Sequence, residues 1–264
     1  MGYKAIVLDV DGTLMVHGEA TVRPAVARAV QQAQKQGVKV VIATGRTHFA
    51  IAPHILGGIR PDYAVCANGA QVLDKKGRVL HANPMTNEEM YALVDFFEDY
   101  NYPLAFCFSD NYHVYVEYQQ MKEIFYASTG HAEYVVDGED QDRHLESMPV
   151  GAFAVLPPEQ LQAFEQQYGY MGLQFVPFKT GYYDVIPQGV NKAEGLKKLL
   201  EHTGWKPEEV VFVGDNDNDA EMLAMGGLSY AMGNGSAKAK AAAAQLAPTA
   251  EEEGARWVVE QLFL

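Results

Sequence analysis

The sequence has little cysteine and no long apolar run, and each shortage excludes a class of protein. Its two cysteines, Cys66 and Cys107, lie in apolar strand-like runs, so we expect reduced, buried thiols, which fit a cytoplasmic protein better than a disulfide framework does. No stretch approaches the roughly 18 consecutive apolar residues of a membrane span, so no membrane partner is expected. The start of the chain, Met1 to Lys4, runs directly into an expected strand, so no signal peptide is expected.

Basic residues are also scarce: 20 Lys and Arg stand against 34 Asp and Glu, a formal net charge of −14. This excess of negative charge argues against nucleic acid or an anionic membrane surface as a partner. Between Pro84 and Gln188 there are 17 acidic residues but only three basic ones, Lys122, Arg143 and Lys179. The rest of the chain therefore holds 17 of each sign (34 − 17 and 20 − 3) and is neutral. This step in composition indicates an inserted domain.

The segments on either side of this stretch alternate apolar strands with amphipathic helices. Strands are expected at Lys4–Asp9, Val38–Ala43, Tyr63–Ala67, Val210–Val213 and Leu228–Ala231. Thr21 is expected to cap a helix that ends at Gln36, and another helix is expected from about Thr47. Near-continuous apolar strands that alternate with helices predict a parallel sheet covered on both faces, a Rossmann-like, doubly wound α/β core.

The middle of the chain has a different pattern, because several expected strands follow one another closely. In Tyr112–Tyr118, aromatic and β-branched residues occupy alternate positions. Helices are expected at Asn87–Tyr100, Gln119–Thr129 and Pro158–Tyr168. This pattern predicts an α+β unit whose antiparallel sheet is hydrophobic on one face. We therefore expect a catalytic core of residues 1–83 and 189–264 and an α+β insertion of residues 84–188.

Four polar motifs stand where the expected strands end or a helix begins. They are L-D-V-D-G-T-L at Leu8–Leu14, A-T-G-R at Ala43–Arg46, the lysine of G-V-N-K at Lys192, and V-G-D-N-D-N-D at Val213–Asp219. In an open parallel sheet, ligands bind beyond the carboxyl ends of the strands. We therefore expect the four motifs to meet at one edge of the sheet, although they are far apart in sequence.

The residue types in these motifs suit the transfer of a phosphoryl group. A phosphomonoester is a dianion that repels nucleophiles, so attack by a carboxylate needs charge neutralisation and in-line placement. Asp9 is the expected nucleophile, which forms an aspartyl-phosphate, and Asp11 is expected to protonate the leaving alkoxide and then deprotonate the water. Mg²⁺, held by oxygens of Asp9 and Asp215, is expected to supply the positive charge.

Other residues of the motifs are expected to hold the phosphate or to support the metal site. The expected phosphate-binding residues are Gly12, Thr13, Thr44, Gly45, Lys192 and Asn218. Asp219 is expected to orient water or ligands from behind the metal's own ligands. Asn68 and Asn191 either line the site or stabilise turns, and Arg46 either contacts substrate or forms a salt bridge beside the site.

These motifs closely resemble those of the haloacid dehalogenase (HAD) phosphatase superfamily. D-V-D-G-T resembles its first motif, Thr44 its second, Lys192 its third and G-D-N-D-N-D its acidic fourth. The insertion, A-N-G-A at Ala67–Ala70 and Y-D-V-I-P-Q-G-V-N-K at Tyr183–Lys192 resemble the Cof-type (HAD-IIB) branch, in which the insertion is a cap. The resemblance implies that Asp11 gives Mg²⁺ its backbone carbonyl, which leaves its carboxylate free for proton transfer.

Motifs and resemblance together predict a Mg²⁺-dependent phosphatase that hydrolyses small phosphorylated metabolites under a cap that serves as a lid. The resemblance implies a sugar phosphate, a phosphorylated cofactor or a nucleotide; no oligomeric state is predicted. One alternative is a hexose phosphomutase, which must hold a second phosphate, and the insertion offers only Arg143, Lys122 and Lys179 for this. The other is a non-catalytic, phosphometabolite-binding regulatory protein, against which the intact acidic residues and lysine of the motifs argue.

Overall fold

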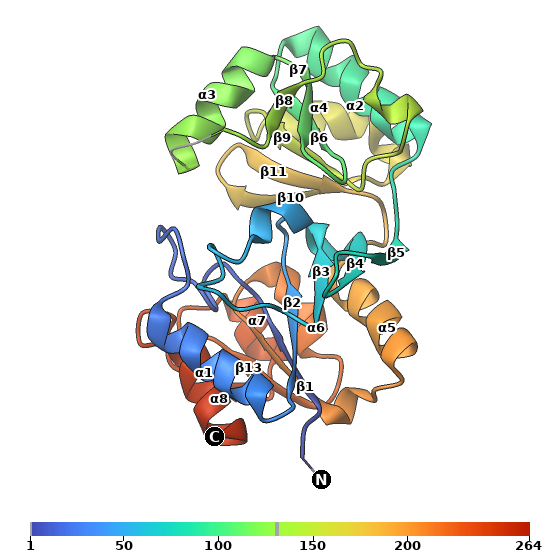
Figure 1. Ribbon diagram of the computed structural model, residues 1–264. Helices are drawn as coiled ribbons and strands as arrows, with labels where there is room; N and C mark the ends of the chain where they lie inside the picture. The colour runs from blue at the N-terminus through green and yellow to red at the C-terminus, as the bar shows by residue number, and fades with distance from the viewer. Residues whose placement is uncertain (1, 130–131) are drawn as a thin grey trace. The chain divides into compact units, whose positions relative to one another are not determined.

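The computed structural model describes residues 2–129 and 132–264 of the chain (Figure 1). The chain divides into two compact units. We call the first, Met1–His81 with Asn191–Leu264, the core unit, and the second, Ala82–Val190, the inserted unit. No helix among the described residues is both long enough and apolar enough to cross a membrane.

The core unit is built on one sheet with the strand order β14-β13-β12-β1-β2-β3-β4-β5. Its strands are β1 (Ala5–Leu8), β2 (Lys39–Ala43), β3 (Tyr63–Cys66), β4 (Gln71–Asp74), β5 (Val79–Ala82), β12 (Val210–Gly214), β13 (Leu228–Ala231) and β14 (Gln245–Leu246). All neighbours from β14 to β3 are parallel, whereas β4, which the sequence pattern did not predict, runs antiparallel to β3. Every residue of β1 and β12 is buried, which explains their unbroken apolar sequences.

Helices cover both faces of this sheet (Figure 1). The α-helices are α1 (Pro24–Lys35), α5 (Lys192–Thr203), α6 (Ala220–Leu223), α7 (Ala237–Ala242) and α8 (Gly254–Phe263), and the 3₁₀ turns are η1 (His48–Ile51), η2 (Ala67–Gly69), η5 (Pro207–Glu209) and η6 (Asp217–Asp219). Ile6 and Leu8 belong to a buried cluster with α1 and α8, whereas Ala5 and Val7 belong to a second cluster with α5, α6 and α7. Alternate residues of β1 therefore point to opposite helical layers, and the predicted doubly wound core is confirmed.

Two helix starts differ from the expectation for local reasons. The first helix begins at Pro24, so the residue that precedes it is Arg23 and not the expected cap Thr21. Pro24 fits the first helical position, and the Thr21 hydroxyl instead donates to the carbonyl oxygen of His54 at 2.7 Å. The helix expected from Thr47 is only the short turn η1. Its successor, Ala52, has an extended backbone, as favoured for a residue that precedes a proline.

The inserted unit has a six-stranded sheet with the order β10-β11-β9-β6-β7-β8. Its strands are β6 (Leu104–Cys107), β7 (Tyr112–Val116), β8 (Val135–Asp137), β9 (Ala152–Val155), β10 (Gln174–Lys179) and β11 (Tyr182–Ile186). Its helices are α2 (Asn87–Tyr100), α3 (Tyr118–Thr129) and α4 (Gln160–Tyr168), with the 3₁₀ turns η3 (Arg143–Leu145) and η4 (Gly169–Met171). The predicted α+β insertion is confirmed.

Two details of this sheet depart from the prediction. The pair β7 and β8 is parallel, because α3 connects the two strands as a crossover. The expectation that only one face is hydrophobic was wrong: Leu104 and Phe106 of β6 join one buried cluster, and Ala105 joins another with Met121 of α3. Alternating strand residues are thus buried on both faces where α3 covers the sheet.

Cys66 and Cys107 are both free and buried, as expected. Burial raises the pKa of the Cys66 thiol to about 12, and burial also raises the pKa of Cys107 well above its usual value. Both thiols are therefore neutral near pH 7 and act as small apolar side chains.

Candidate active site

The carboxyl ends of β1 and β12 bring two aspartates together from opposite ends of the chain. The strands are parallel neighbours with Leu8 opposite Val213, and the Asp9 backbone N–H donates to the Val213 carbonyl oxygen at 3.0 Å. Asp9 therefore emerges beside the loop that carries Asp215. Thr44, after β2, lies at the same edge of the sheet, where ligands of open α/β sheets bind.

Lys192 lies at the centre of these strand ends. It is the first residue of α5, and its ammonium group donates to Oδ1 of Asp9 at 2.6 Å and to Oδ1 of Asp219 at 2.7 Å. The lysine is 2% exposed. Burial alone would lower its pKa, but the carboxylates of Asp219 and Asp9 raise the pKa above its ordinary value, so the lysine carries its charge. Asn191 caps α5: its side-chain oxygen accepts the Glu194 N–H at 2.8 Å.

Three buried carboxylates surround this ammonium group. One oxygen each of Asp9, Asp215 and Asp219 lies within 4.8 Å of the others, which is the spacing of a metal-binding cluster. Burial raises the pKa of Asp9 well above its usual value, while burial and the neighbouring Asp219 raise that of Asp215 to about 6. The single charge of Lys192 does not neutralise three carboxylates, so the cluster keeps negative charge. A cation bound among these carboxylates would stabilise their charged forms.

Asp219 organises the loop that carries Asp215. It is fully buried, and its Oδ2 accepts the backbone N–H groups of Asp215 at 2.9 Å and Asn216 at 3.0 Å. Its Oδ1 is the oxygen that binds Lys192. We expected Asp219 to lie behind the residues that bind the metal directly. Its carboxylate lies within the acidic cluster, and it also fixes the backbone at Asp215 and Asn216.

Asp11 lies apart from this cluster and is paired with Arg46. The Arg46 guanidinium donates from Nε to Oδ2 at 2.8 Å and from Nη2 to Oδ1 at 2.7 Å, a bidentate geometry that fixes the plane of the carboxylate. Of the two roles considered for Arg46, this is the salt bridge. The Asp11 side chain is 42% exposed, so it remains accessible to a reacting group.

Gly12 is required between these two aspartates. Its φ is +84°, in the left-handed region, and a Cβ there would collide with the carboxylate of Asp215. Next to it, the Thr13 hydroxyl donates to Oδ1 of Asp215 at 2.9 Å. Thr13, expected to bind phosphate, thus orients an acidic residue of the cluster.

The other expected site residues form a linked set of loops. The hydroxyl oxygen of Thr44 accepts the Arg46 N–H at 3.1 Å across Gly45, and the Asn68 N–H donates to the Thr44 carbonyl oxygen at 3.1 Å. Asn68 is 1% exposed with a φ of +51°, which asparagine tolerates, and its side-chain oxygen accepts from Nδ2 of Asn218 at 2.9 Å. These loops come from β2, β3 and β12, so the structure brings the four motifs together.

Sequence reasoning missed two residues beside the site. Asn234 donates from Nδ2 to the Gly12 carbonyl oxygen at 2.9 Å and accepts the Ala250 N–H at 2.8 Å, so it holds the turn after Asp11. The other is His17, whose Nε2 lies 3.8 Å from Oδ2 of Asp215. Asn234 follows shortly after β13 at the same edge of the sheet, and this position in the sequence could have indicated its role. Nothing in the sequence around His17 indicates a place beside the site.

The doubly wound sheet thus carries a buried lysine among aspartates at its carboxyl edge, where ligands of such sheets bind. The chain belongs to the haloacid dehalogenase-like hydrolase family, whose model matches residues 6–259. The family confirms the resemblance read from the four motifs.

The relatives of the chain include several phosphatases. It is 26% identical to phosphatase YwpJ of Bacillus subtilis over 98% of this chain and 100% of the relative. It is 29% identical to the pyridoxal phosphate phosphatase YbhA of Escherichia coli over 92% of each. Its fold matches the HAD subclass IIB sugar phosphatase BT4131 with a TM-score of 0.80 at 23% identity, over 98% of each chain. The family and these relatives confirm the predicted phosphomonoesterase class.

Proposed function

We propose that the chain is a Mg²⁺-dependent phosphatase that acts on small phosphorylated metabolites through an aspartyl-phosphate at Asp9. The observation that carries this proposal is the contact of Lys192 with Asp9 inside the cluster of three buried aspartates. A lysine that binds one oxygen of Asp9 fixes its carboxylate and leaves the other oxygen to attack phosphorus. It also supplies positive charge toward the phosphoryl oxygens.

The donor set of the cluster suits Mg²⁺. Its ligand atoms are carboxylate oxygens, which this hard cation prefers, and too few of them are present to displace all of its waters. The raised pKa values of Asp9 and Asp215 reflect burial and, for both, repulsion by Asp219, which a bound divalent cation would relieve. Asp9 and Asp215, with the backbone carbonyl of Asp11, would hold the ion; when bound, it neutralises the charge of the phosphate.

Two steps then complete the hydrolysis. The Asp9 oxygen forms a bond to phosphorus while the bond to the leaving alkoxide breaks, and the Asp11 carboxyl gives its proton to that alkoxide. Water next attacks the phosphorus of the aspartyl-phosphate, Asp11 takes its proton, and the bond to Asp9 breaks to release inorganic phosphate. Thr44, the N–H groups near Gly45, and Asn218 would hold the phosphoryl oxygens during both steps.

The inserted unit, Ala82–Val190, would act as a lid that selects the leaving group. The core motifs account for the phosphate alone, so discrimination between metabolites has to come from elsewhere in the chain. Phosphatases of a pyridoxal phosphate and of sugars among the similar proteins support a small, soluble substrate. A lid of this size suits a metabolite that it encloses.

The phosphomutase alternative has little support in the inserted unit. Its one arginine, Arg143, pairs with Asp110 at 3.5 Å and Glu146 at 3.3 Å and lies over the ring of Phe108. Lys179 likewise lies over the ring of Tyr182, 4.6 Å from its centroid. A second phosphate would have to compete with these partners, so hydrolysis is the function that we propose.

The proposal is tested by measuring phosphate release from a panel of phosphorylated metabolites, with Mg²⁺ and with EDTA. We expect release that needs the metal and that is lost in the Asp9→Asn variant. The ranking of substrates identifies what the lid selects. Isomerisation of a hexose phosphate without phosphate release would favour the mutase instead, and binding without turnover would favour the regulatory protein.

A further inference from the structure

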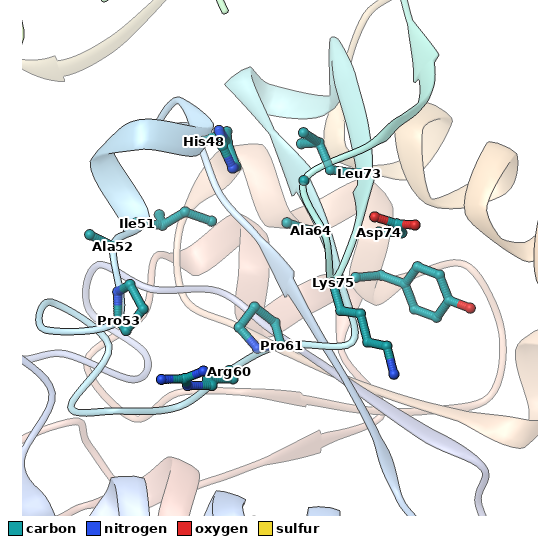
Figure 2. Close-up of a pocket in the computed structure, with 12 residues that line it drawn as sticks. His48, Ile51, Ala52, Pro53, Arg60, Pro61, Ala64, Leu73, Asp74 and Lys75 are labelled. Carbon is teal, nitrogen blue, oxygen red and sulfur yellow. The ribbon is translucent and has the colours of Figure 1, made fainter. Parts of the chain in front are cut away.

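A groove in the core unit lies outside the site described above. It has a volume of about 310 Å³ and runs between η1 and the strands β3 and β4 (Figure 2). Its apolar lining includes Ile51, Ala52, Pro53, Pro61 and Leu73. A volume of this size, with a mostly apolar wall and a few polar groups, is typical of small-molecule sites.

Positive charge predominates along this groove. Arg60 and Lys75 line it. Within residues 2–129 and 132–264, the charged groups of these two residues make no ion pair. The one carboxylate of the lining belongs to Asp74, which accepts from Arg78 Nε at 2.7 Å and from two backbone N–H groups. Because the Arg78 side chain already neutralises Asp74, the remaining charge of the lining is positive in a protein whose net charge is −14.

Both walls of the groove continue into loops of the active site. The turn η1 begins two residues after Arg46, and the third guanidinium nitrogen, Nη1, approaches the Ala50 carbonyl oxygen in η1 at 3.4 Å. The other two nitrogens hold Asp11. On the opposite wall, β3 leads directly to Asn68, which contacts Thr44. A ligand between these walls would press on elements that position Asp11 and the phosphate-binding loop.

We propose that this groove is a regulatory site for a small amphipathic anion, with an apolar body of one or two rings and one anionic group. The apolar wall would bury the rings, and Arg60 and Lys75 would bind the anionic group. Occupancy moves η1 and its Ala50 carbonyl, which changes how Arg46 holds Asp11. The regulatory part rests on the proposed function: the rate of the step that needs a proton from Asp11 changes with occupancy.

The test uses 8-anilino-1-naphthalenesulfonate as the probe, with saturating inorganic phosphate and Mg²⁺ to fill the catalytic site. Its fluorescence titration is compared in the wild type, in Arg60→Gln/Lys75→Gln, and in the matched control Arg28→Gln/Lys35→Gln, which removes two exposed cations of α1. We expect the groove variant to bind the probe about tenfold more weakly and the control to bind it normally. N-phenyl-1-naphthylamine, which lacks the sulfonate, should show no such difference.

A second variant and a kinetic measurement complete the test. Ala52→Trp fills the groove from its apolar side and should abolish probe binding, with circular dichroism to check folding. The probe should alter kcat for an alkyl phosphate, whose leaving group needs a proton, more than kcat for 4-nitrophenyl phosphate, and only when the groove is intact. Equal probe binding in the groove and control variants would overturn the site; groove binding without a change in kcat would overturn its regulatory role.

Discussion

The acidic cluster should make Asp215 a source of instability when no metal is bound. Asp215 is 4% exposed and lies beside Asp9 and Asp219, and burial and Asp219 raise its pKa to about 6 from an ordinary value of 3.8. Its charged form is therefore less favourable in the folded protein than in the unfolded chain. We predict that Asp215→Asn, which keeps the shape and an acceptor for the Thr13 hydroxyl, stabilises the metal-free protein near neutral pH.

The sign and size of this change in unfolding free energy follow from the linkage between proton binding and folding. A carboxyl with a raised folded pKa binds more protons in the folded state, so its contribution to stability is fully present below about pH 4 and is lost as pH rises through 6. A shift of about two pKa units corresponds to roughly 3 kcal/mol. In EDTA, the unfolding free energy of Asp215→Asn minus that of the wild type should therefore increase by about 3 kcal/mol as the pH rises from 4 to 7.5.

The assay is urea unfolding followed by tryptophan fluorescence. Both tryptophans, Trp205 and Trp257, belong to the core unit, so the signal reports the unit that contains the cluster. In Mg²⁺ the gain should disappear, because the cation stabilises the wild-type carboxylate. The reasoning would be refuted if, in EDTA, Asp215→Asn became less stable relative to the wild type as the pH rises.

Three further variants test separate parts of the site. Asp11→Asn should lower kcat on alkyl phosphates by about 10²- to 10⁴-fold but kcat on 4-nitrophenyl phosphate far less, because the nitrophenolate leaves without a proton; equal losses would remove Asp11 from its acid role. Gly12→Ala should displace Asp215 and weaken Mg²⁺ activation, measured as a higher metal concentration for half-maximal activity, whereas an unchanged value would contradict the close packing of Gly12. Lys192→Met should reduce the unfolding free energy at pH 7.5 in EDTA by about 3–5 kcal/mol, because it leaves buried carboxylates without their cation, and stability close to that of the wild type would show that the lysine does not neutralise them.

The sequence predicts the strand ends of the core because their signals are local. β1 and β12 are short, unbroken apolar runs followed by acidic residues, and parallel strands place such ends together whatever lies between them in sequence. Helix α2 is equally local: Thr86 and Glu89 form a reciprocal cap at its start, and Asn101 adopts the left-handed conformation that ends it. Its bounds match the prediction.

The side-chain partners within the site were harder to predict, because they depend on how loops approach one another. The pairing of Arg46 with Asp11 joins residues 35 positions apart, and the contact of Lys192 with Asp9 joins residues 183 positions apart. The spacing of G-D-N-D-N-D does not indicate that Asp219 is buried more deeply than Asp215. The groove beside η1 could not be predicted for the same reason, because its two cations, Arg60 and Lys75, come from different loops.

The central claim is the covalent intermediate at Asp9, and the most direct measurement is to trap it. The enzyme is mixed with substrate and Mg²⁺, quenched in acid during turnover and reduced with borohydride, which converts an acyl phosphate to an alcohol. Mass spectrometry of the peptide that contains Asp9 and Asp11 should locate this conversion at Asp9, and Asp9→Asn should lower kcat by about a thousandfold or more. Turnover without any modified Asp9, together with an active Asp9→Asn variant, would contradict the account.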